Sequence, residues 1–185
     1  MRSGLVVALI LSTACTRSDP NDDAPRALAD STRLPPSAYA ELAGSIRAAL
    51  AARGCTIPQS YRDQAPHNAV RGRFTTSAVM DVAVLCAKDS STTILVFHGE
   101  SPDSVSEVAP RHDSEFGEYD ATTPWRFARA IDVASPEYIR SRHARYGGPQ
   151  PPPLDHDGIN DIFVGKASVV WYWNGSRWLS LQGAD

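Results

Sequence analysis

The segment SVVWYWNGSRWLSL, residues 168–181, constrains the fold of this chain more than any other stretch of it. Two apolar runs flank Asn174 and Gly175, the dipeptide that two-residue turns of β-hairpins prefer. Pairing the runs across that turn sets Trp171 opposite Trp178. The side chains then divide between two faces, one with Trp171, Trp173 and Trp178 and the other with Val170, Tyr172, Leu179 and Leu181. The sequence therefore predicts a C-terminal hairpin that is apolar on both sides.

A hairpin of this kind cannot leave both faces in water, so other parts of the chain or another protein must cover at least one of them. The tryptophan face admits two interpretations. Trp171, Trp173 and Trp178 either fill the core of the domain, since tryptophan supplies a large apolar area, or form a surface that stacks on sugar rings or on a partner protein. Under the second interpretation they are the candidate binding residues.

The N-terminal segment MRSGLVVALILSTA, residues 1–14, has the layout of a bacterial export signal: one arginine, seven apolar residues from Leu5 to Leu11, and then small residues. Its apolar stretch is too short to span a bilayer as a helix. The motif LSTAC resembles a lipobox, after which lipoprotein signal peptidase cuts, and this resemblance implies that Cys15 carries a lipid anchor. Thr16 in place of an aspartate points to the periplasmic face of the outer membrane. The alternative is an ordinary signal peptide with a free Cys15.

The charge balance argues against one class of partner. The chain has 18 lysine and arginine residues against 21 aspartate and glutamate residues, and cleavage after residue 14 removes one arginine, which leaves 17 against 21 and a net charge near −4. No basic stripe is available to displace counterions, so nucleic acid is not an expected partner. Residues 15–36 are polar and contain prolines, a composition typical of a flexible tether. We therefore expect a single globular domain over residues 37–185.

Two cysteines, Cys55 and Cys86, remain behind the proposed lipid anchor. An even pair in an oxidising compartment favours a disulfide bond between them. A bond that closes a loop of this size stabilises a fold by about 3 to 4 kcal/mol in the chain-entropy model. The alternative is a pair of buried free thiols.

Hydrophobic periodicity predicts an N-terminal helix that begins at Ser37 as its cap and ends at Gly54. Its apolar residues recur at intervals of three and four, as one buried helix face requires: Tyr39, Leu42, Ile46, Ala49 and Leu50. The helix ends one residue before Cys55, so the predicted disulfide would join its C-terminal end to the strand that contains Cys86.

That strand is DVAVLC, residues 81–86, which is apolar on both faces and is therefore expected at the centre of a sheet. Residues 92–98 are its predicted hairpin partner. Ser135 can cap a second helix from residue 136 to about 145, where proline suits the first turn and glycines follow the end. The fold class predicted is α+β: one antiparallel sheet of about five to seven strands with these two helices.

The loop LDHDGIND, residues 154–161, spaces three carboxylates around a glycine in front of an apolar run. Calcium prefers hard oxygen ligands, which Asp155, Asp157, Asp161 and the carbonyl of Ile159 could supply. Six or more ligands are usual, so water would have to complete the shell. The alternative is a turn in which these side chains accept hydrogen bonds from backbone amides.

Two segments eighty residues apart share a pattern, FTTSAVMDVAVL from Phe74 and LDHDGINDIFVG from Leu154. Both resemble FG-GAP repeats of the integrin-propeller type, in which an acidic DxDGxxD loop between strands binds calcium. The first copy has Thr75, Ser77 and Ala78 where ligands and glycine belong, so it implies no metal. Two copies cannot close a propeller, whose smallest forms need about four blades, and they predict two strand–turn–strand units in one sheet.

No catalytic motif is recognisable. The five histidines are scattered without metal-ligand spacing, and no nucleophile motif or phosphate loop occurs. The acidic residues Glu115, Glu118 and Asp120 could do acid–base work but are more often solvated in such polar sequence. A basic cluster on the second helix, which is an anion contact or a solvated face, consists of Arg140, Arg142, His143 and Arg145.

These features together predict a non-catalytic, lipid-anchored protein of the cell envelope that binds a protein partner or cell-wall glycan. The segments GCTIPQ and GKASVVWYW also resemble those of exported bacterial lipoproteins without an assigned activity, so this resemblance implies none here. A second hypothesis is a periplasmic hydrolase, or an inhibitor of a cell-wall hydrolase, that uses the acidic residues or the histidines in a cleft. The third is a purely structural protein without a ligand.

Overall fold

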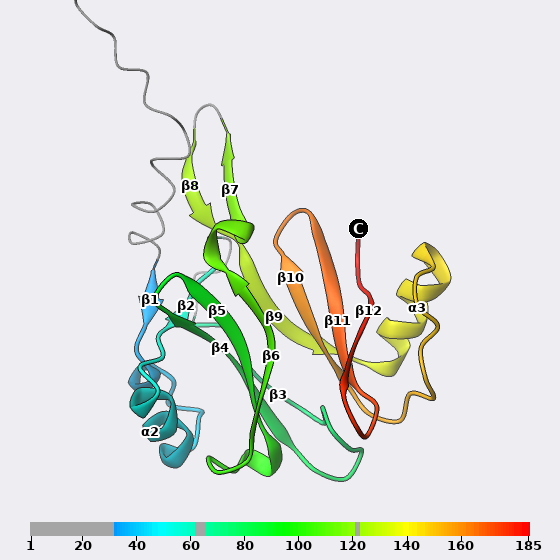
Figure 1. The fold of residues 1–185 in the computed structure, drawn as a ribbon, viewed down its shortest axis with the longest axis horizontal. Helices are drawn as coiled ribbons and strands as arrows, with labels where there is room; N and C mark the ends of the chain where they lie inside the picture. Colours follow the sequence, from blue (N-terminus) through cyan, green and yellow to red (C-terminus); the bar gives the residue numbers. More distant parts are fainter. Residues whose placement is uncertain (1–31, 62–65, 121–122) are drawn as a thin grey trace, which may run out of the picture.

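A computed structural model describes residues 32–61, 66–120 and 123–185. Over these residues the fold is mixed α+β, as predicted, with two α-helices and several antiparallel sheets (Figure 1). The predicted signal segment and Cys15 lie outside the described residues. Among the helices that are described, none is long and apolar enough to cross a membrane.

The strands form two larger sheets instead of the single sheet of five to seven strands that we predicted. In each sheet four strands follow one another as antiparallel neighbours. The first sheet contains β3 (Ala69–Gly72), β4 (Asp81–Lys88), β5 (Ser91–Phe97) and β6 (Val105–His112). The second contains β9 (Arg129–Ala134), β10 (Gly158–Phe163), β11 (Ala167–Trp173) and β12 (Trp178–Gln182). Two short ribbons pair β1 (Arg33–Leu34) with β2 (Ile57–Pro58) and β7 (Gly117–Asp120) with β8 (Thr123–Phe127).

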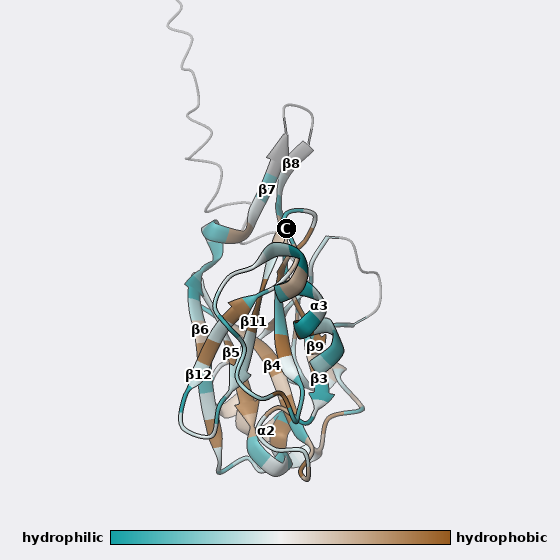
Figure 2. Cartoon of the chain, turned by 90° about the vertical axis from the view of Figure 1, so that its right-hand side faces the viewer, coloured by the Kyte–Doolittle hydropathy of each residue, from teal (hydrophilic) through white to brown (hydrophobic). Residues whose placement is uncertain are grey.

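The two larger sheets pack against each other through one apolar cluster. Alternate residues of each strand point into this layer, among them Leu85 and Ile94 from the first sheet and Ile131 and Ile159 from the second. Figure 2 shows apolar residues concentrated along the strands, while the visible face of the second helix is largely hydrophilic. The predicted repeat segments therefore enter strands of different sheets, β4 and β10, so the prediction that they share one sheet is wrong.

Each helix covers the outer face of one sheet, which gives four layers in the order helix, sheet, sheet, helix (Figure 1). Helix α2 (Gly44–Ala52) buries Ile46 and Leu50 against the first sheet. Helix α3 (Pro136–Tyr146) buries Ile139 against the second sheet. The second helix forms as predicted, because the hydroxyl of Ser135 accepts a hydrogen bond from the amide of Tyr138 at 3.2 Å.

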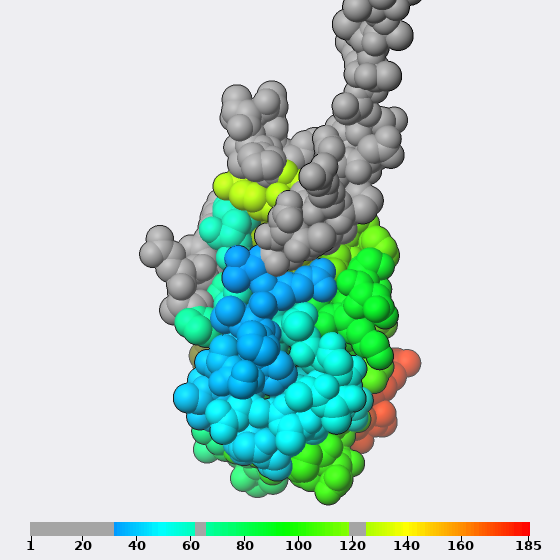
Figure 3. All heavy atoms as spheres, turned by 90° about the vertical axis from the view of Figure 1, so that its left-hand side faces the viewer, coloured from blue at the N-terminus to red at the C-terminus, as the bar shows by residue number. Residues whose placement is uncertain are grey.

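The N-terminal helix is shorter than predicted. A 3-10 helix, η1 (Pro36–Ala38), comes first, and the chain then turns before α2 begins at Gly44. Tyr39 and Leu42 lie in that turn but are buried in the same cluster as the helix, so their apolar spacing reflects a shared core and not one helix. The hydroxyl of Tyr39 donates to the carbonyl of His67 at 2.6 Å, which holds it outside a helical path. Figure 3 shows this segment, coloured from blue to cyan, spread over one side of the molecule.

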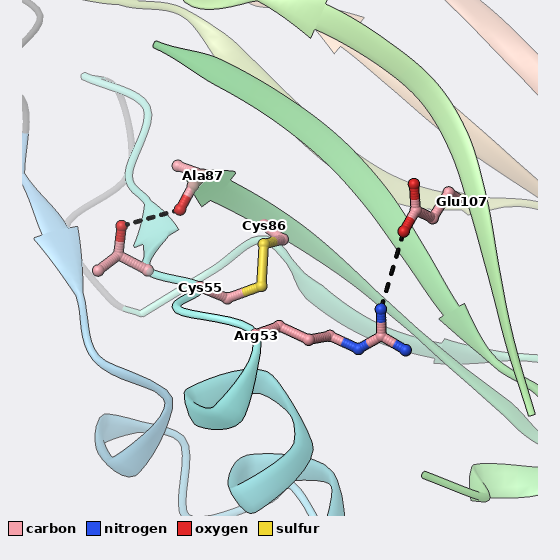
Figure 4. The surroundings of a disulfide bond; sticks show 6 residues. Arg53, Cys55, Cys86, Ala87 and Glu107 are labelled. Carbon is pink, nitrogen blue, oxygen red and sulfur yellow. Dashed lines mark hydrogen bonds and ion pairs between the residues drawn. A yellow bond between two sulfur atoms is a disulfide. The ribbon is translucent and has the colours of Figure 1, made fainter. Parts of the chain in front are cut away.

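The predicted disulfide between Cys55 and Cys86 is present, with 5.2 Å between the two Cα atoms. It joins Cys55, three residues after the end of α2, to strand β4 (Figure 4). Next to it, Thr56 and Ala87 exchange two backbone hydrogen bonds of 3.0 and 2.7 Å. The end of the helix is thus attached to the sheet both covalently and by a β-bridge.

The fold begins earlier than the predicted boundary at residue 37. Arg33 and Leu34, which we assigned to the tether, form β1 and pair with Pro58 and Ile57. The guanidinium of Arg33 donates to the carboxylate of Asp113 at 2.7 Å. This polar segment buries little apolar area of its own. It is held in place because its backbone pairs with β2 and because Arg33 forms an ion pair with the buried carboxylate of Asp113.

The C-terminal hairpin forms as predicted, but its register differs by two residues. Trp173, and not Trp171, lies opposite Trp178. Because successive side chains of a strand alternate between faces, a shift of two leaves every side chain on its predicted face. Trp171, Trp173 and Trp178 therefore still share one side, on which Trp171 and Trp178 pack against the apolar layer between the sheets.

The turn explains the shift. Asn174 is its first residue and not a central one, because its amide donates to the carbonyl of Arg177 at 3.1 Å. The side-chain oxygen of Asn174 accepts hydrogen bonds from the amides of Ser176 and Arg177, at 3.1 and 3.0 Å. Gly175 has a φ of 91°, which glycine adopts at little cost.

Candidate functional site

Three segments that the sequence analysis singled out separately meet at one groove of about 300 Å³. They are the β3–β4 loop, the acidic segment in front of β10, and the turn of the C-terminal hairpin. We call this site the loop groove, and the residues that line it are Thr75, Thr76, Ser77, Pro152, Pro153, Asp155, His156, Tyr172, Trp173, Asn174 and Gly175. The two segments that resemble FG-GAP repeats thus lie in different sheets but contribute to the same site.

Backbone hydrogen bonds hold two of these segments together. The amide of Asp157 donates to the carbonyl of Arg73 at 2.8 Å, and the amide of Arg73 donates to the carboxylate of Asp157 at 3.0 Å. Arg73 lies in the β3–β4 loop two residues before Thr75, and Asp157 directly follows His156. The wall of the groove is therefore built by mutual pairing between loops and not by either loop alone.

The β3–β4 loop is further anchored by Asp81, which is fully buried. One of its carboxylate oxygens accepts from the amides of Phe74 and Thr75 and from the hydroxyl of Thr75, at 3.1, 2.9 and 2.8 Å. The other oxygen accepts from the amide of Gly99 at 2.8 Å. Four hydrogen bonds to one carboxylate set the position of Thr75 at the rim of the groove.

Tyr172 and His156 form the aromatic floor. Their rings stack with centroids 4.3 Å apart and an interplanar angle of 5°. The hydroxyl of Tyr172 lies 3.1 Å from the Oδ1 of Asp155, and it accepts a hydrogen bond from the backbone amide of Asp155 at 3.3 Å. Burial raises the pKa of Tyr172. A tyrosine hydroxyl is protonated at neutral pH even without such a shift, so it can donate to the carboxylate.

The groove carries its negative charge on Asp155. That side chain is 74 % exposed, while His156 beside it is almost completely buried. The Nδ1 of His156 lies 2.9 Å from the carbonyl of Asp157, an acceptor, so this nitrogen carries a proton. The Nε2 atom lies 3.8 Å from the Oδ1 of Asp155 and faces the carboxylate. Asp155 is thus an oriented hydrogen-bond acceptor at an open site.

The three tryptophans have different environments, although they share a face. Only Trp173 lines the loop groove, and its ring packs at 5.6 Å and 57° against that of Trp178. Trp171 and Trp178 pack against the apolar layer between the sheets. The indole nitrogen of Trp171 also donates to Asp161 at 3.2 Å. Of the predicted binding surface, one tryptophan lies at a groove, and the other two contribute to the core.

The four proposed calcium ligands do not converge. Asp155 contacts Tyr172, Asp157 accepts from the amide of Arg73, and Ile159 lies within β10, paired with Val133 and Trp171. Asp161 lies further along the same strand, beside Arg129. Within the described residues no group of three or more His, Cys, Asp and Glu side chains is placed to hold a metal ion. Of the three carboxylates, that of Asp157 accepts from a backbone amide, as the alternative of a turn expects, whereas those of Asp155 and Asp161 have side-chain partners.

Arg129 is the residue that sequence reasoning missed. Its fully buried guanidinium donates two hydrogen bonds of 2.8 Å to Asp161. It also donates to the carbonyl and hydroxyl of Thr92 and to the carbonyl of Ala109, all in the first sheet. The sequence did contain a signal for this pair. Arg129 and Asp161 each interrupt a largely apolar strand, and charged side chains are buried in such strands only when they are paired.

Neither Glu115 nor Glu118, two of the acidic residues proposed for catalysis, is among the residues that line the loop groove. Glu115 accepts from the amide of His112 and closes a 3-10 turn, η3 (Asp113–Phe116). Glu118 lies on β7, and the side chain of Asp120 is outside the part of the chain that the structure describes. Two histidines contact serine hydroxyls, His98 with Ser106 at 2.6 Å and His112 with Ser114 at 2.7 Å.

A catalytic serine–histidine pair also needs a carboxylate that orients the imidazole, and neither contact has one among the described residues. Among the described residues, no carboxylate forms a hydrogen bond to the imidazole of His98 or of His112. Both histidines lie on or next to strand β6 of the first sheet, whereas the loop groove includes a different histidine, His156. The loop groove itself presents aromatic side chains, hydroxyls and the carboxylate of Asp155.

Comparison of the chain with protein families, with curated proteins and with solved structures finds no match.

Proposed function

We propose that this chain is a non-catalytic, lipid-anchored protein of the cell envelope that binds cell-wall glycan in the loop groove. The proposal is supported by the combination of a partly exposed aromatic side chain, Trp173, with the exposed carboxylate of Asp155 in one groove, where the buried, stacked pair Tyr172 and His156 lies beside Asp155. The apolar faces of sugar rings pack on aromatic side chains, and sugar hydroxyls donate to carboxylates. A groove of about 300 Å³ is at the small end of ligand sites, which suits one or two sugar units.

The sequence supports the location. We infer an acyl anchor on the periplasmic face of the outer membrane from two features, the export signal of residues 1–14 and the lipobox-like motif that ends at Cys15. The polar composition of the segment between Cys15 and the start of the fold is typical of a tether, which would let the folded part reach material beside the membrane. Cell-wall glycan is a ligand of this compartment.

Binding without turnover follows from how Asp155 is placed. A catalytic carboxylic acid is generally buried or placed beside a second carboxylate, whereas Asp155 is largely exposed and accepts from Tyr172. The second carboxylate that glycoside hydrolysis requires is not among the residues that line the groove. We therefore favour a binding protein over the alternative, a hydrolase or an inhibitor of one.

The test is binding of cell-wall disaccharides to the exported chain, with Cys15→Ser to prevent lipidation, measured by calorimetry and by NMR shifts. We expect shifts at the loop groove and at least a tenfold weaker affinity for Asp155→Asn and for Trp173→Ala, because each removes a contact with the sugar. Ser180→Ala, at an exposed position of β12 outside the groove, is the control and should bind like the wild type. Absence of binding, or binding that both groove variants retain, contradicts the proposal.

A further inference from the structure

A second cavity, of about 280 Å³, lies on the other side of the proline segment that borders the loop groove. It is lined by Arg140 and His143 of α3 and by the chain from Gln150 to Leu154. Pro152 and Pro153 line both cavities, so only this short segment separates them. We call the second site the α3 cavity.

The charges of the two cavities are opposite. Asp155 is the acidic residue of the loop groove, whereas the ionisable side chains of the α3 cavity are Arg140 and His143. Proline has no backbone N–H, so the ridge between the sites offers few donors. The charged donors for a ligand in the α3 cavity therefore come from the side chains of the helix, and the side-chain amide of Gln150 adds a neutral one.

Arg140 is the basic residue of α3 that is available to a ligand. The guanidinium groups of Arg142 and Arg145 lie over the rings of Tyr138 and Tyr146, at 4.7 and 5.2 Å. Arg140 instead donates to Glu137 at 2.7 Å, in a pair whose side chains are 55 % and 78 % exposed. An ion pair this exposed contributes little, so a carboxylate in the cavity can replace Glu137 as the partner.

His143 supplies a second, oriented group. Its Nδ1 lies 3.1 Å from the carbonyl of Gly147, an acceptor, so Nδ1 carries a proton and the ring is held by the end of the helix. The Nε2 atom remains for the cavity, where it donates once the ring is protonated. Arg140 and His143 are one helical step of three residues apart and therefore lie on one face.

We propose that the α3 cavity is a subsite for a carboxylate, so that the ligand of this protein is an anionic glycan whose sugar ring occupies the loop groove. This inference rests on the proposed function and names the class of its ligand. Arginine pairs with carboxylates through two parallel hydrogen bonds, which fixes direction as well as adding affinity. A glycan with a carboxylate at one end would bind in a single orientation across the proline ridge.

Two disaccharides that differ in the carboxylate test the subsite. N-acetylglucosaminyl-N-acetylmuramic acid carries one carboxylate, and N,N′-diacetylchitobiose has none but offers a comparable N-acetylated pair of sugars. Calorimetry on the full exported chain with Cys15→Ser is expected to show at least fivefold tighter binding of the acidic disaccharide, with a preference that falls as salt is added.

Substitution identifies the residues. Arg140→Gln, alone and with His143→Gln, should abolish the preference while leaving the affinity for diacetylchitobiose unchanged. Arg145→Gln makes the same charge change on the same helix outside the cavity and should keep the preference. Thermal unfolding of each variant confirms that it is folded.

The outcomes separate the two proposals. Equal affinity of the wild type for both disaccharides, or a preference that survives the double substitution, overturns the subsite but leaves glycan binding standing. Failure of both disaccharides to bind overturns the proposed function and the subsite with it.

Discussion

The guanidinium of Arg129 forms two hydrogen bonds of 2.8 Å with the two carboxylate oxygens of Asp161 between the sheets, where its side chain is fully buried. The ring of Phe116 lies 4.7 Å from the guanidinium carbon. The remaining donors of Arg129 bond to Thr92 and Ala109 of the first sheet. One polar network therefore links the two sheets within an otherwise apolar layer.

Breaking this network from one side should be costly. Arg129→Met leaves Asp161 buried without its counter-charge and is expected to lower the free energy of unfolding by about 3 to 5 kcal/mol in urea denaturation. The double variant Arg129→Met with Asp161→Leu should recover part of that loss, because no unpaired charge remains. Arg71→Met is the matched control: its exposed pair with Glu100 should cost less than about 1 kcal/mol. A double variant no more stable than Arg129→Met contradicts this account.

Calcium should not stabilise the protein. A ligand that binds only the native state raises the melting temperature, but Asp157 and Asp161 already have partners in Arg73 and Arg129. We expect the same thermal unfolding curve in excess chelator and in millimolar calcium. A rise in melting temperature that Asp157→Ala abolishes would instead establish the acidic loop as a metal site.

Alkaline pH should destabilise the fold through Tyr39. Burial raises the pKa of Tyr39 to about 12, against about 10 for tyrosine in an unfolded chain. The unfolded chain then loses its proton first, so the stability due to this group is complete below pH 10 and is lost as the pH rises towards 12. Denaturation at several pH values should show a loss of about 1.4 kcal/mol per pH unit in this window. Tyr39→Phe should lower that slope to the part that the raised pKa of Tyr172 contributes, while Tyr146→Phe, at a half-exposed tyrosine, should leave the slope unchanged.

Asp113 should respond to its partner from the N-terminal strand. Burial raises the pKa of Asp113, and the charge of Arg33 lowers it part of the way back. Because the folded pKa is raised, the stability due to this carboxyl is complete below its unfolded pKa near 3.9 and is lost as the pH rises through the folded pKa. Arg33→Gln should move the pKa of Asp113, followed by its carboxyl ¹³C shift, further upward. The control Arg111→Gln, in an exposed pair with Glu115, should leave it in place.

The sequence by itself determined the features that depend on residues close together in the chain or on composition. Ser135 and the glycines behind α3 set the limits of that helix, because capping involves only the residues of one turn. The alternating pattern of the C-terminal hairpin assigned Trp171, Trp173 and Trp178 to one face, since that alternation survives a shift of two residues. The disulfide between Cys55 and Cys86 could be predicted because these are the two cysteines that remain after Cys15 and because an oxidising compartment was expected.

The tertiary structure alone decided where distant segments meet. Apolar spacing could not separate Tyr39 from α2, because a turn and a helix that share one core bury the same residue types. Periodicity also cannot tell one large sheet from two packed sheets, since both bury alternate residues. The pairing of Arg129 with Asp161 and the convergence of three loops on Asp155 depend on contacts between residues far apart in the chain. Only packing of the whole chain brings such residues together, and the candidate site arises from that packing.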